Sequence, residues 1–412
     1  MTAVRRFALV GSLLVSTLLI DACVGDDPVT GGTTSDDGGR PTGNDSGKPP
    51  GVEDSGQGTD SGNGAACDGG LTCGGVCTDT ASSAKNCGRC DHDCGTAKCT
   101  KGVCEAALVA GVALGDAKIT SLTTDQGDDN PKALAQRIFW SVTGTGGGVF
   151  QDNVIGGNTL TLSTTAAAPA TNLAVTPLDV FWFNVFFAGP PQPIVKSQVN
   201  TAGTTPTGVG SINGSSIQSI LYDATNKYVI GSYAVNASSF GLFRCGPIGG
   251  TVTCANLTTF TGQPGGNIVS DGTDVYFSNP SDGFIQRSTL NGGSVGSYIA
   301  AQDTPTLLRI DGTNLYWTNV GTKTIQRGAL AGSVKKQMAS TTNVADGLAA
   351  DAVNVYWTDS TTGTVNFAPV TGAGPNTAYV TLGASPQPMR LARDKGFLYF
   401  THKGGIYRVA LP

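Results

Sequence analysis

The eleven cysteines are the residues of this chain with the most distinctive chemistry, because thiols form disulfide bonds or bind metal ions. Eight of them lie between residues 67 and 104, a segment with too small a hydrophobic core to fold without covalent links. We therefore predict that this segment is a disulfide-rich module in an oxidising compartment, with about a hundred possible pairings. The eight cysteines are Cys67, Cys73, Cys77, Cys87, Cys90, Cys94, Cys99 and Cys104.

A metal site is the alternative use of these thiols. Cys87-x-x-Cys90 has the spacing of metal ligands, and His92 lies close by. In an exported chain we favour disulfides, and we predict no metal site here. The second histidine, His402, falls in a polar turn of the repeat described below, where a structural role is expected. No Ser-His-Asp set can be assembled, so no catalytic residue is predicted.

Cys23 stands apart from the other cysteines and follows an export signal. A short basic start precedes an apolar stretch over residues 7–20, which is too short to span a membrane. Ile20-Asp21-Ala22-Cys23 resembles the lipobox of bacterial lipoproteins. The resemblance implies that residues 1–22 are removed and that Cys23 carries a lipid anchor to a membrane. Val24 in place of Asp favours the outer membrane; an ordinary cleaved signal is the alternative.

Residues 23–66 form the next segment, which consists mostly of Gly, Asp, Ser, Thr and Pro and contains no aromatic residue. Such a segment cannot bury enough apolar surface to offset its ordering entropy, so we predict a disordered tether. Its acids account for the net charge of -5, and the remainder of the chain is close to neutral. Nucleic-acid binding is excluded because phosphate contacts need clustered Lys and Arg.

Residues 105–412 repeat an aromatic pair at spacings of 40 to 48 residues. An Asp precedes the pair by five residues in five of the seven copies, and Gly-containing turns close the units. About four short strands per unit at this period predict an all-β fold, a β-propeller of seven blades, with six as the alternative. The pairs are Phe139-Trp140, Phe181-Trp182, Tyr228-Val229, Tyr276-Phe277, Tyr316-Trp317, Tyr356-Trp357 and Tyr399-Phe400.

The last copy stops before a fourth strand. The apolar stretch 106–114 precedes the first copy and is predicted to supply that strand, which would close the ring and remove exposed edges. Cys245 and Cys254 flank a Gly- and Pro-rich turn, and we predict that they link the two strands of one hairpin.

Two parts of the chain resemble known families. Tyr316-Trp317-Thr318-Asn319 and Tyr356-Trp357-Thr358-Asp359 resemble the YWTD repeats of low-density-lipoprotein-receptor-type propellers. That family usually has six blades and binds proteins without catalysis. The cysteine pattern around Cys73-Gly-Gly-Val-Cys77 and Asn86-Cys87-Gly-Arg-Cys90 resembles the stigma-specific protein family. This second resemblance implies an extracellular stalk or interaction module.

Function is expected where the copies differ. Arg309 and Arg390 fall on predicted innermost strands, where they would face the central channel. Phe186 and Phe187 end an unusually aromatic hairpin and are candidate binding anchors, although packing between blades is the alternative. The loop over residues 125–131 gathers three acids, so Ca²⁺ is the one cofactor left open, with a solvated turn as the alternative.

We favour a surface lipoprotein whose propeller binds an envelope or extracellular protein or glycan without catalysis. The first alternative is an exported propeller enzyme of the metal-dependent lactone hydrolase or lyase type, because fold does not settle function. Such an enzyme needs several acids, Asn or His at one mouth of the channel. The second alternative is a structural envelope protein without a specific ligand.

Overall fold

The structure is a computed structural model, and every structural statement below concerns the residues that it describes. Cys23, the signal, the tether up to residue 65, Phe186 and Phe187 lie outside them. The described residues are 66–67, 70–111, 118–126, 134–144, 147–163, 172–183, 192–203, 205–214, 216–249, 252–332, 334–372, 374–387 and 389–412.

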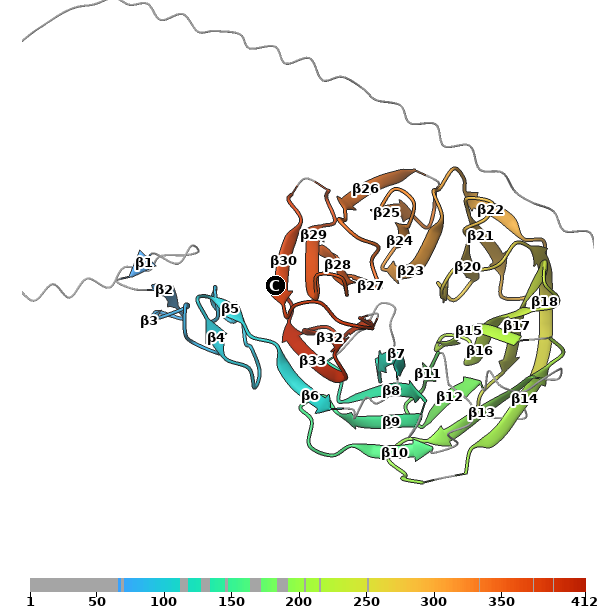
Figure 1. The fold of residues 1–412 in the computed structure, drawn as a ribbon, viewed down its shortest axis with the longest axis horizontal. Helices are drawn as coiled ribbons and strands as arrows, with labels where there is room; N and C mark the ends of the chain where they lie inside the picture. Colours follow the sequence, from blue (N-terminus) through green and yellow to red (C-terminus); the bar gives the residue numbers. More distant parts are fainter. Residues whose placement is uncertain are drawn as a thin grey trace, which may run out of the picture. The chain divides into compact units, whose positions relative to one another are not determined.

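Within these residues, seven four-stranded antiparallel sheets form a ring, and the chain runs around the ring in order (Figure 1). This confirms the seven-bladed propeller. Blade 1 is β7 (Lys118–Thr124), β8 (Arg137–Thr143), β9 (Gly148–Asn153) and β10 (Leu160–Ser163). Blade 2 is β11 (Ala174–Val175), β12 (Asp179–Phe183), β13 (Gln192–Gln198) and β14 (Thr207–Ile212). Blade 3 is β15 (Ser216–Asp223), β16 (Tyr228–Ala234), β17 (Ser239–Gly246) and β18 (Thr253–Thr261).

The second half of the ring is more regular. Blade 4 is β19 (Ile268–Ser270), β20 (Asp274–Asn279), β21 (Phe284–Thr289) and β22 (Gly296–Ile299). Blade 5 is β23 (Pro305–Asp311), β24 (Asn314–Asn319), β25 (Thr324–Ala329) and β26 (Lys335–Ser340). Blade 6 is β27 (Gly347–Ala350), β28 (Asn354–Asp359), β29 (Thr364–Pro369) and β30 (Thr377–Thr381). Blade 7 is β31 (Leu391–Arg393), β32 (Phe397–His402), β33 (Gly405–Ala410) and β6 (Ala107–Gly111).

The aromatic pairs explain why the blades stack. Each pair lies on the second strand of its blade, and neighbouring residues of a strand point to opposite faces of the sheet. Tyr316 therefore packs in one cluster with Trp357 of the following blade, and Trp317 packs with Tyr276 of the preceding one. The same arrangement closes the ring, because Tyr399 shares a cluster with Trp140 of the first blade. Each buried ring contributes roughly 1.5–3 kcal/mol of hydrophobic stabilisation.

The aspartate five residues before the pair caps the turn between the first and second strands. In blade 6, Oδ1 of Asp351 accepts hydrogen bonds from the backbone N–H groups of Val353 at 2.8 Å and Asn354 at 2.7 Å. Its Oδ2 accepts a hydrogen bond from the Tyr356 hydroxyl at 2.7 Å. The spacing of five therefore reflects a direct contact, in which the Asp stabilises the turn. The same hydroxyl contact joins Asp271 to Tyr276 at 2.9 Å and Asp394 to Tyr399 at 2.8 Å.

The N-terminal strand closes the ring as predicted. Strand β6 pairs with β33 of the last copy, with Gly405 opposite Gly111 and Arg408 opposite Ala107. Cys245 and Cys254 lie directly opposite each other on β17 and β18 and form a disulfide, so the predicted hairpin link is also present.

The cysteine module contains β1 (Ala66–Cys67), β2 (Gly70–Cys73), β3 (Val76–Thr78), β4 (Cys99–Thr100) and β5 (Val103–Cys104). Its disulfides join Cys73 to Cys90, Cys87 to Cys99 and Cys94 to Cys104, and Cys77 is also disulfide-bonded. These bonds indicate an extracytoplasmic protein. Within the described residues, no helix is long and apolar enough to cross a membrane.

The module packs against the last blade. Nε2 of His92 lies 2.8 Å from the backbone oxygen of Leu411, and Arg408 donates a hydrogen bond to Thr96 Oγ1 at 2.9 Å. The guanidinium of Arg408 lies 4.9 Å from the ring centre of Phe397. Because Arg408 belongs to β33, which pairs with β6, the module braces the same place where the ring closes. Gly62–Pro412 accordingly forms one compact unit.

Candidate functional site

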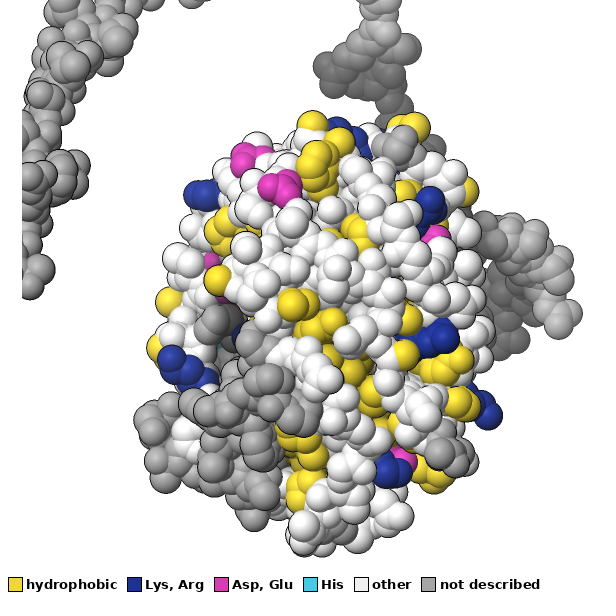
Figure 2. Space-filling view, turned by 90° about the vertical axis from the view of Figure 1, so that its right-hand side faces the viewer, with side chains coloured by type: hydrophobic (Ala, Val, Ile, Leu, Met, Phe, Trp, Pro, Cys, Tyr) yellow, Lys and Arg dark blue, Asp and Glu magenta, His cyan; other side chains and the backbone are white. Residues whose placement is uncertain are grey.

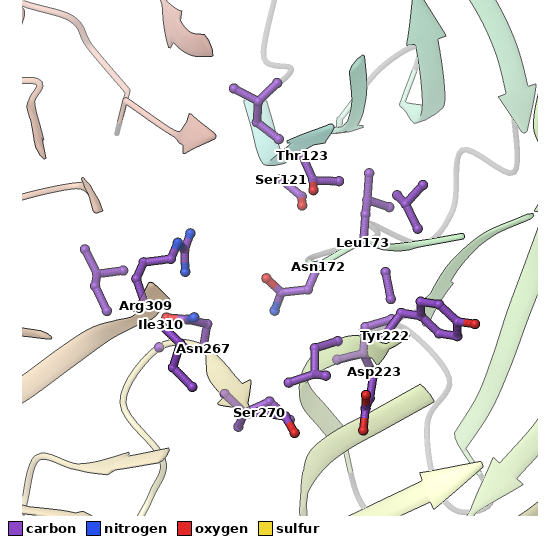
Figure 3. Close-up of a pocket in the computed structure, with 18 of the residues that line it drawn as sticks. Ser121, Thr123, Asn172, Leu173, Tyr222, Asp223, Asn267, Ser270, Arg309 and Ile310 are labelled. Atoms are coloured by element: carbon purple, nitrogen blue, oxygen red, sulfur yellow. The ribbon is translucent and has the colours of Figure 1, made fainter. Parts of the chain in front are cut away.

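The innermost strands of all seven blades line a central cavity of about 810 Å³. This volume falls in the range of small-molecule sites, roughly 300–1,000 Å³. The wall mixes aliphatic side chains with amides, hydroxyls and two arginines; Figure 3 shows one of the arginines, Arg309, with amides and hydroxyls of the wall. Its polar side chains include Ser121, Thr123, Asn172, Gln218, Asn267, Ser270, Arg309, Asp346 and Arg390.

Two amides of the wall fix neighbouring blades to each other. The Asn267 side chain donates to the backbone oxygen of Leu308 at 2.7 Å and accepts from the backbone nitrogen of Leu308 at 2.8 Å. The Asn172 side chain donates to the backbone oxygen of Gln218 at 3.1 Å. The inner strands are therefore held in register across blade boundaries, which gives the cavity a fixed wall.

Arg309 lies on β23 and lines the cavity, as the sequence predicts. Its Nη1 donates to the backbone oxygen of Leu308 at 2.8 Å, so the guanidinium itself is held by the backbone of its own strand. Figure 3 shows the guanidinium reaching into the cavity from one wall and the Asn172 amide reaching in from another. A cation and an amide therefore face the same space.

Arg390 also lines the cavity and immediately precedes β31. Its backbone is fixed, because its N–H donates to Thr401 Oγ1 at 2.8 Å and its carbonyl accepts from Thr401 N at 3.1 Å. Among the described residues its guanidinium has no hydrogen-bond or ion-pair partner, and its Nε is buried. Burial lowers the pKa of Arg390, and the nearby Asp346 carboxylate acts in the opposite direction.

The carboxylates of the wall are already engaged by the protein. Asp346 Oδ2 accepts a hydrogen bond from the backbone of Ser360 at 2.6 Å. Asp223 accepts from Thr225 N at 2.9 Å, and Asp271 accepts from Tyr276. Asp125, which lines the cavity as well, forms an ion pair with Arg137 at 3.3 Å and accepts from Gln136 N at 3.1 Å. These acids are therefore structural in this conformation.

An ion pair that the sequence did not suggest lies beside this wall. Arg393 at the end of β31 donates to Asp311 at the end of β23 at 2.5 Å, with side chains 5% and 13% exposed. Burial is the main cause that raises the pKa of Asp311, and Arg393 lowers it. The sequence contained a signal for this residue. In the last copy Arg393 stands directly before the Asp, whereas the same position is the small Ser270 in copy four and Ala350 in copy six.

The other predicted site residues are placed as follows. His402 ends β32, is buried, and its Nε2 lies 2.7 Å from the backbone oxygen of Gly383, outside the cavity wall. Phe186 and Phe187 lie outside the described residues, and Phe181, Trp182 and Phe183 before them are buried between blades. The Ca²⁺ interpretation of the 125–131 loop stays a prediction, because residues 127–131 are outside the described part.

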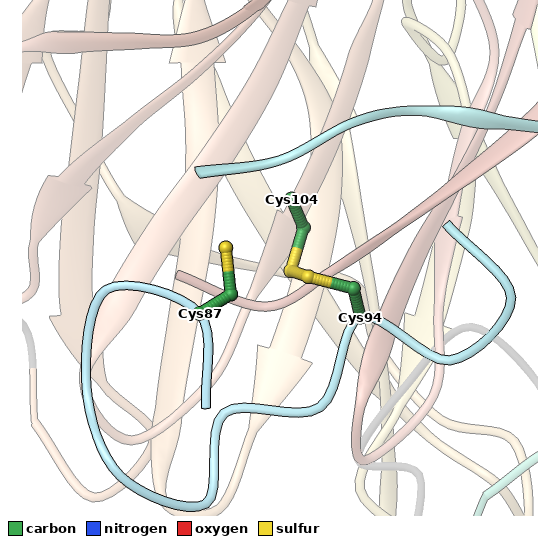
Figure 4. A group of neighbouring side chains, drawn as sticks. All are labelled: Cys87, Cys94 and Cys104. Carbon is green, nitrogen blue, oxygen red and sulfur yellow. A yellow bond between two sulfur atoms is a disulfide. The ribbon is translucent and has the colours of Figure 1, made fainter. Parts of the chain in front are cut away.

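Three sulfur atoms of the module lie close together (Figure 4). They belong to Cys87, Cys94 and Cys104, and all three cysteines are disulfide-bonded. Both ring nitrogens of His92 face backbone oxygens, those of Cys87 and Leu411. In this state the cluster has no free thiolate to offer a metal ion, which agrees with the disulfide interpretation.

The outer surface is a weaker candidate than the channel. Figure 2 shows a side of the molecule that is mostly uncharged and polar, with hydrophobic and charged side chains dispersed over it. The exposed large hydrophobic residues of the blades belong to different blades, as Leu134, Leu178, Val334 and Val353 illustrate. Scattered exposed apolar residues are normal and mark no interface.

No protein-family model matches the chain, and no curated protein matches it. Several solved structures share the fold. Virginiamycin B lyase from Staphylococcus aureus superposes with a TM-score of 0.56 at 12% identity, over 75% of this chain and all of the lyase. A streptogramin B lyase gives 0.54 at 15% identity, over 73% of this chain and 96% of the other. The computationally designed Ika8 protein gives 0.51 at 11% identity, over 74% and 99%. At these identities the likeness shows the β-propeller fold alone.

Proposed function

We propose that this protein is a membrane-anchored surface lipoprotein whose propeller binds a glycan in its central channel without catalysis. One observation carries the proposal. The cavity has a fixed wall, yet the Arg390 guanidinium at that wall lacks an acceptor among the described residues. An unmatched donor at a partly buried site costs stability, and a ligand that supplies the acceptor would offset that cost.

Binding is favoured over catalysis by the state of the acids. A general base needs a free carboxylate or imidazole within reach of the substrate. No histidine is among the described residues of the wall, and its four aspartates are held by backbone or side-chain partners. The solved lyases share only the fold with this chain, so they give no reason to assign their activity to it.

The anchoring part of the proposal rests on Cys23 and the sequence around it. The lipid would hold the protein to the outer membrane, and residues 23–66 would give the propeller reach. Cys23→Ser is expected to release the protein from the membrane fraction into the soluble fraction of the cells that make it. If that variant stays in the membrane fraction, the anchor is elsewhere.

Channel binding is tested by thermal unfolding of the complete purified protein with a panel of neutral and acidic oligosaccharides. A ligand that binds only the native state raises the unfolding midpoint. Asn172→Trp places a large ring in the cavity, because Asn172 points into it (Figure 3). The expected result is a ligand-dependent rise in the native protein that N172W abolishes. A rise that N172W leaves intact would move the site out of the channel.

A further inference from the structure

We propose that the channel selects an acidic sugar, a hexuronate unit whose carboxylate is bound by Arg390 with help from Arg309. This inference deepens the proposed function and rests on it. It concerns the chemical class of the ligand, which the fold and the comparisons leave undefined.

Arg390 presents the hydrogen-bond donors of its guanidinium at the cavity wall. A guanidinium carries five N–H donors and no acceptor, and it matches a carboxylate through two parallel hydrogen bonds. The backbone of Arg390 is fixed on both sides by Thr401, so the side chain starts from a defined position. The side chain is half-buried, its Nε is buried, and no described residue accepts a hydrogen bond from its guanidinium. The site is therefore prepared for an anionic acceptor.

The two arginines, Arg309 and Arg390, lie on either side of blade 6 at the cavity wall. Between the inner strands of Arg309 and Arg390 lies the start of blade 6, where Asp346 is followed by Gly347. A Cβ atom at Gly347 would lie 2.6 Å from Leu391 Cβ and 2.8 Å from Thr358 Oγ1, so no larger residue fits there. The close approach brings β27 and β31 together beside Arg390. Among the described acids, Asp346 is the one that interacts with Arg390, and Ser360 N–H donates a hydrogen bond to its Oδ2.

The rest of the wall carries polar groups that can bind the hydroxyls of a sugar, which a simple anion lacks. Amide and hydroxyl groups of Asn172, Gln218, Ser121 and Thr123 come from three further blades. Among the described residues, neither the side-chain carbonyl of Asn172 nor that of Gln218 accepts a hydrogen bond, and sugar hydroxyls are donors. Arginines on one side and amide acceptors on the other fit a ring that carries one carboxylate and several hydroxyls.

The experiment is titration calorimetry on the complete protein with mono-, di- and trisaccharides of galacturonate and glucuronate. The neutral galactose and glucose oligomers of equal length serve as comparison ligands, and acetate and sulfate serve as simple anions. We expect an acidic oligosaccharide to bind at least tenfold more tightly than its neutral counterpart. Acetate and sulfate are expected to bind far more weakly, because they lack the hydroxyls.

Two variants assign the carboxylate contact. Arg390→Gln is expected to weaken the acidic ligand at least tenfold and to leave the neutral oligomers unchanged. Gln218→Glu adds a negative charge to the wall with little change of shape, and Ser216, which now accepts from Gln218 at 2.6 Å, can donate to the new carboxylate. It is expected to weaken the same ligand several-fold. Arg287→Gln is the matched control, because Arg287 lies on β21 away from the cavity wall.

The outcomes separate this inference from the proposed function. Neutral and acidic oligomers binding equally, with R390Q silent, would overturn the acidic-sugar assignment and leave channel binding in place. If acetate or sulfate binds as tightly as the acidic oligosaccharide, the assignment of the ligand as a sugar is overturned. No binding of any oligosaccharide, while unfolding shows every variant folded, would overturn both proposals. Selective loss of the acidic ligand in both R390Q and Q218E supports the assignment.

Discussion

Arg390 and Arg393 lie three residues apart at the same inner strand, and the fold gives them opposite surroundings. Arg393 is buried and pairs with Asp311 of blade 5 at 2.5 Å. Arg390 faces the cavity, and no acceptor for it is present among the described residues. Nε of both arginines is buried without a hydrogen-bond partner, so the two differ in the carboxylate, which Arg393 binds and which no described residue offers Arg390 within ion-pair distance. Under the proposed function, Arg393 serves the structure and Arg390 serves a ligand.

The largest expected effect tests the structural member of this comparison. Arg393→Met leaves the Asp311 carboxylate buried and unpaired, which is expected to reduce the free energy of unfolding by about 3–5 kcal/mol. The double variant R393M/D311L removes both charges and is expected to regain most of that loss. Urea unfolding monitored by tryptophan fluorescence measures both. If R393M costs no more than Arg390→Met, the contrast between the two arginines is wrong.

The pH dependence of this loss is the second test. The folded-state pKa of Asp311 lies above its ordinary value, chiefly because of burial, and Arg393 holds it down. Folding therefore takes up a proton between the ordinary and the raised pKa, so the contribution of Asp311 to stability falls as pH rises through that window. Removal of Arg393 raises this pKa further and widens the window upward.

The R393M penalty is accordingly expected to be largest near neutral pH and to shrink on acidification, by up to about 1.4 kcal/mol per pH unit within the window. Unfolding curves of the native protein and R393M between pH 4 and 7 measure the difference. The double variant R393M/D311L lacks the titrating carboxyl and should show no such trend. A penalty independent of pH would mean that lost packing, and not the unpaired charge, causes the destabilisation.

A smaller loss of stability is expected at the turns in which a tyrosine hydroxyl donates to an Asp carboxylate. Tyr356→Phe removes the hydroxyl that donates to Asp351, which is expected to cost about 1.5–3 kcal/mol. Tyr276→Phe is the matched variant in blade 4, where Asp271 is exposed and water can replace the hydroxyl. Its cost is expected to be below about 1 kcal/mol. Equal costs in a thermal unfolding assay would show that burial of the turn does not matter.

The smallest effect on stability is expected for substitution of Arg390, the proposed ligand-binding arginine. Arg390→Met removes an unmatched donor group, so the free energy of unfolding is expected to stay within about 1 kcal/mol of the native value or to rise. The same variant is expected to lose the acidic ligand. Chemical unfolding and calorimetry on one preparation check both statements. A loss of stability as large as that of R393M would make Arg390 a structural residue.

Much of the fold was predictable because its signals are local and repeated. The aromatic pairs at spacings of 40 to 48 residues predicted seven blades, and the unmatched strand of the last copy predicted closure by β6. The Asp five residues before the pair, which is present in five of the seven copies, marks the turn that precedes the second strand. Blade 2 shows how far such a motif can drift, since Thr176 replaces the Asp and its Oγ1 accepts from Leu178 N and Asp179 N.

The candidate site was predictable only in part. The repeat placed Arg309 and Arg390 on inner strands, and both do line the cavity. It did not indicate that Asn172 and Asn267 join neighbouring blades, because each contact crosses from one copy to the next. The hydroxyl and amide groups of the wall are common residue types, and no sequence pattern distinguishes those that face a cavity.

The sequence by itself determined the blade, because hydrophobic alternation, turn residues and the Asp-to-Tyr spacing act within some 40 residues of chain. Tertiary structure decided what joins distant residues. It selected Cys94–Cys104 and the other disulfides of the module from many possible pairings, and it placed His92 beside Leu411. It also gave Arg393 an ion pair with a carboxylate from another blade, whereas Arg390 forms no ion pair with any described residue. The physical reason is that charge pairing depends on which strands meet across the ring, and that geometry exists only once all seven blades have closed.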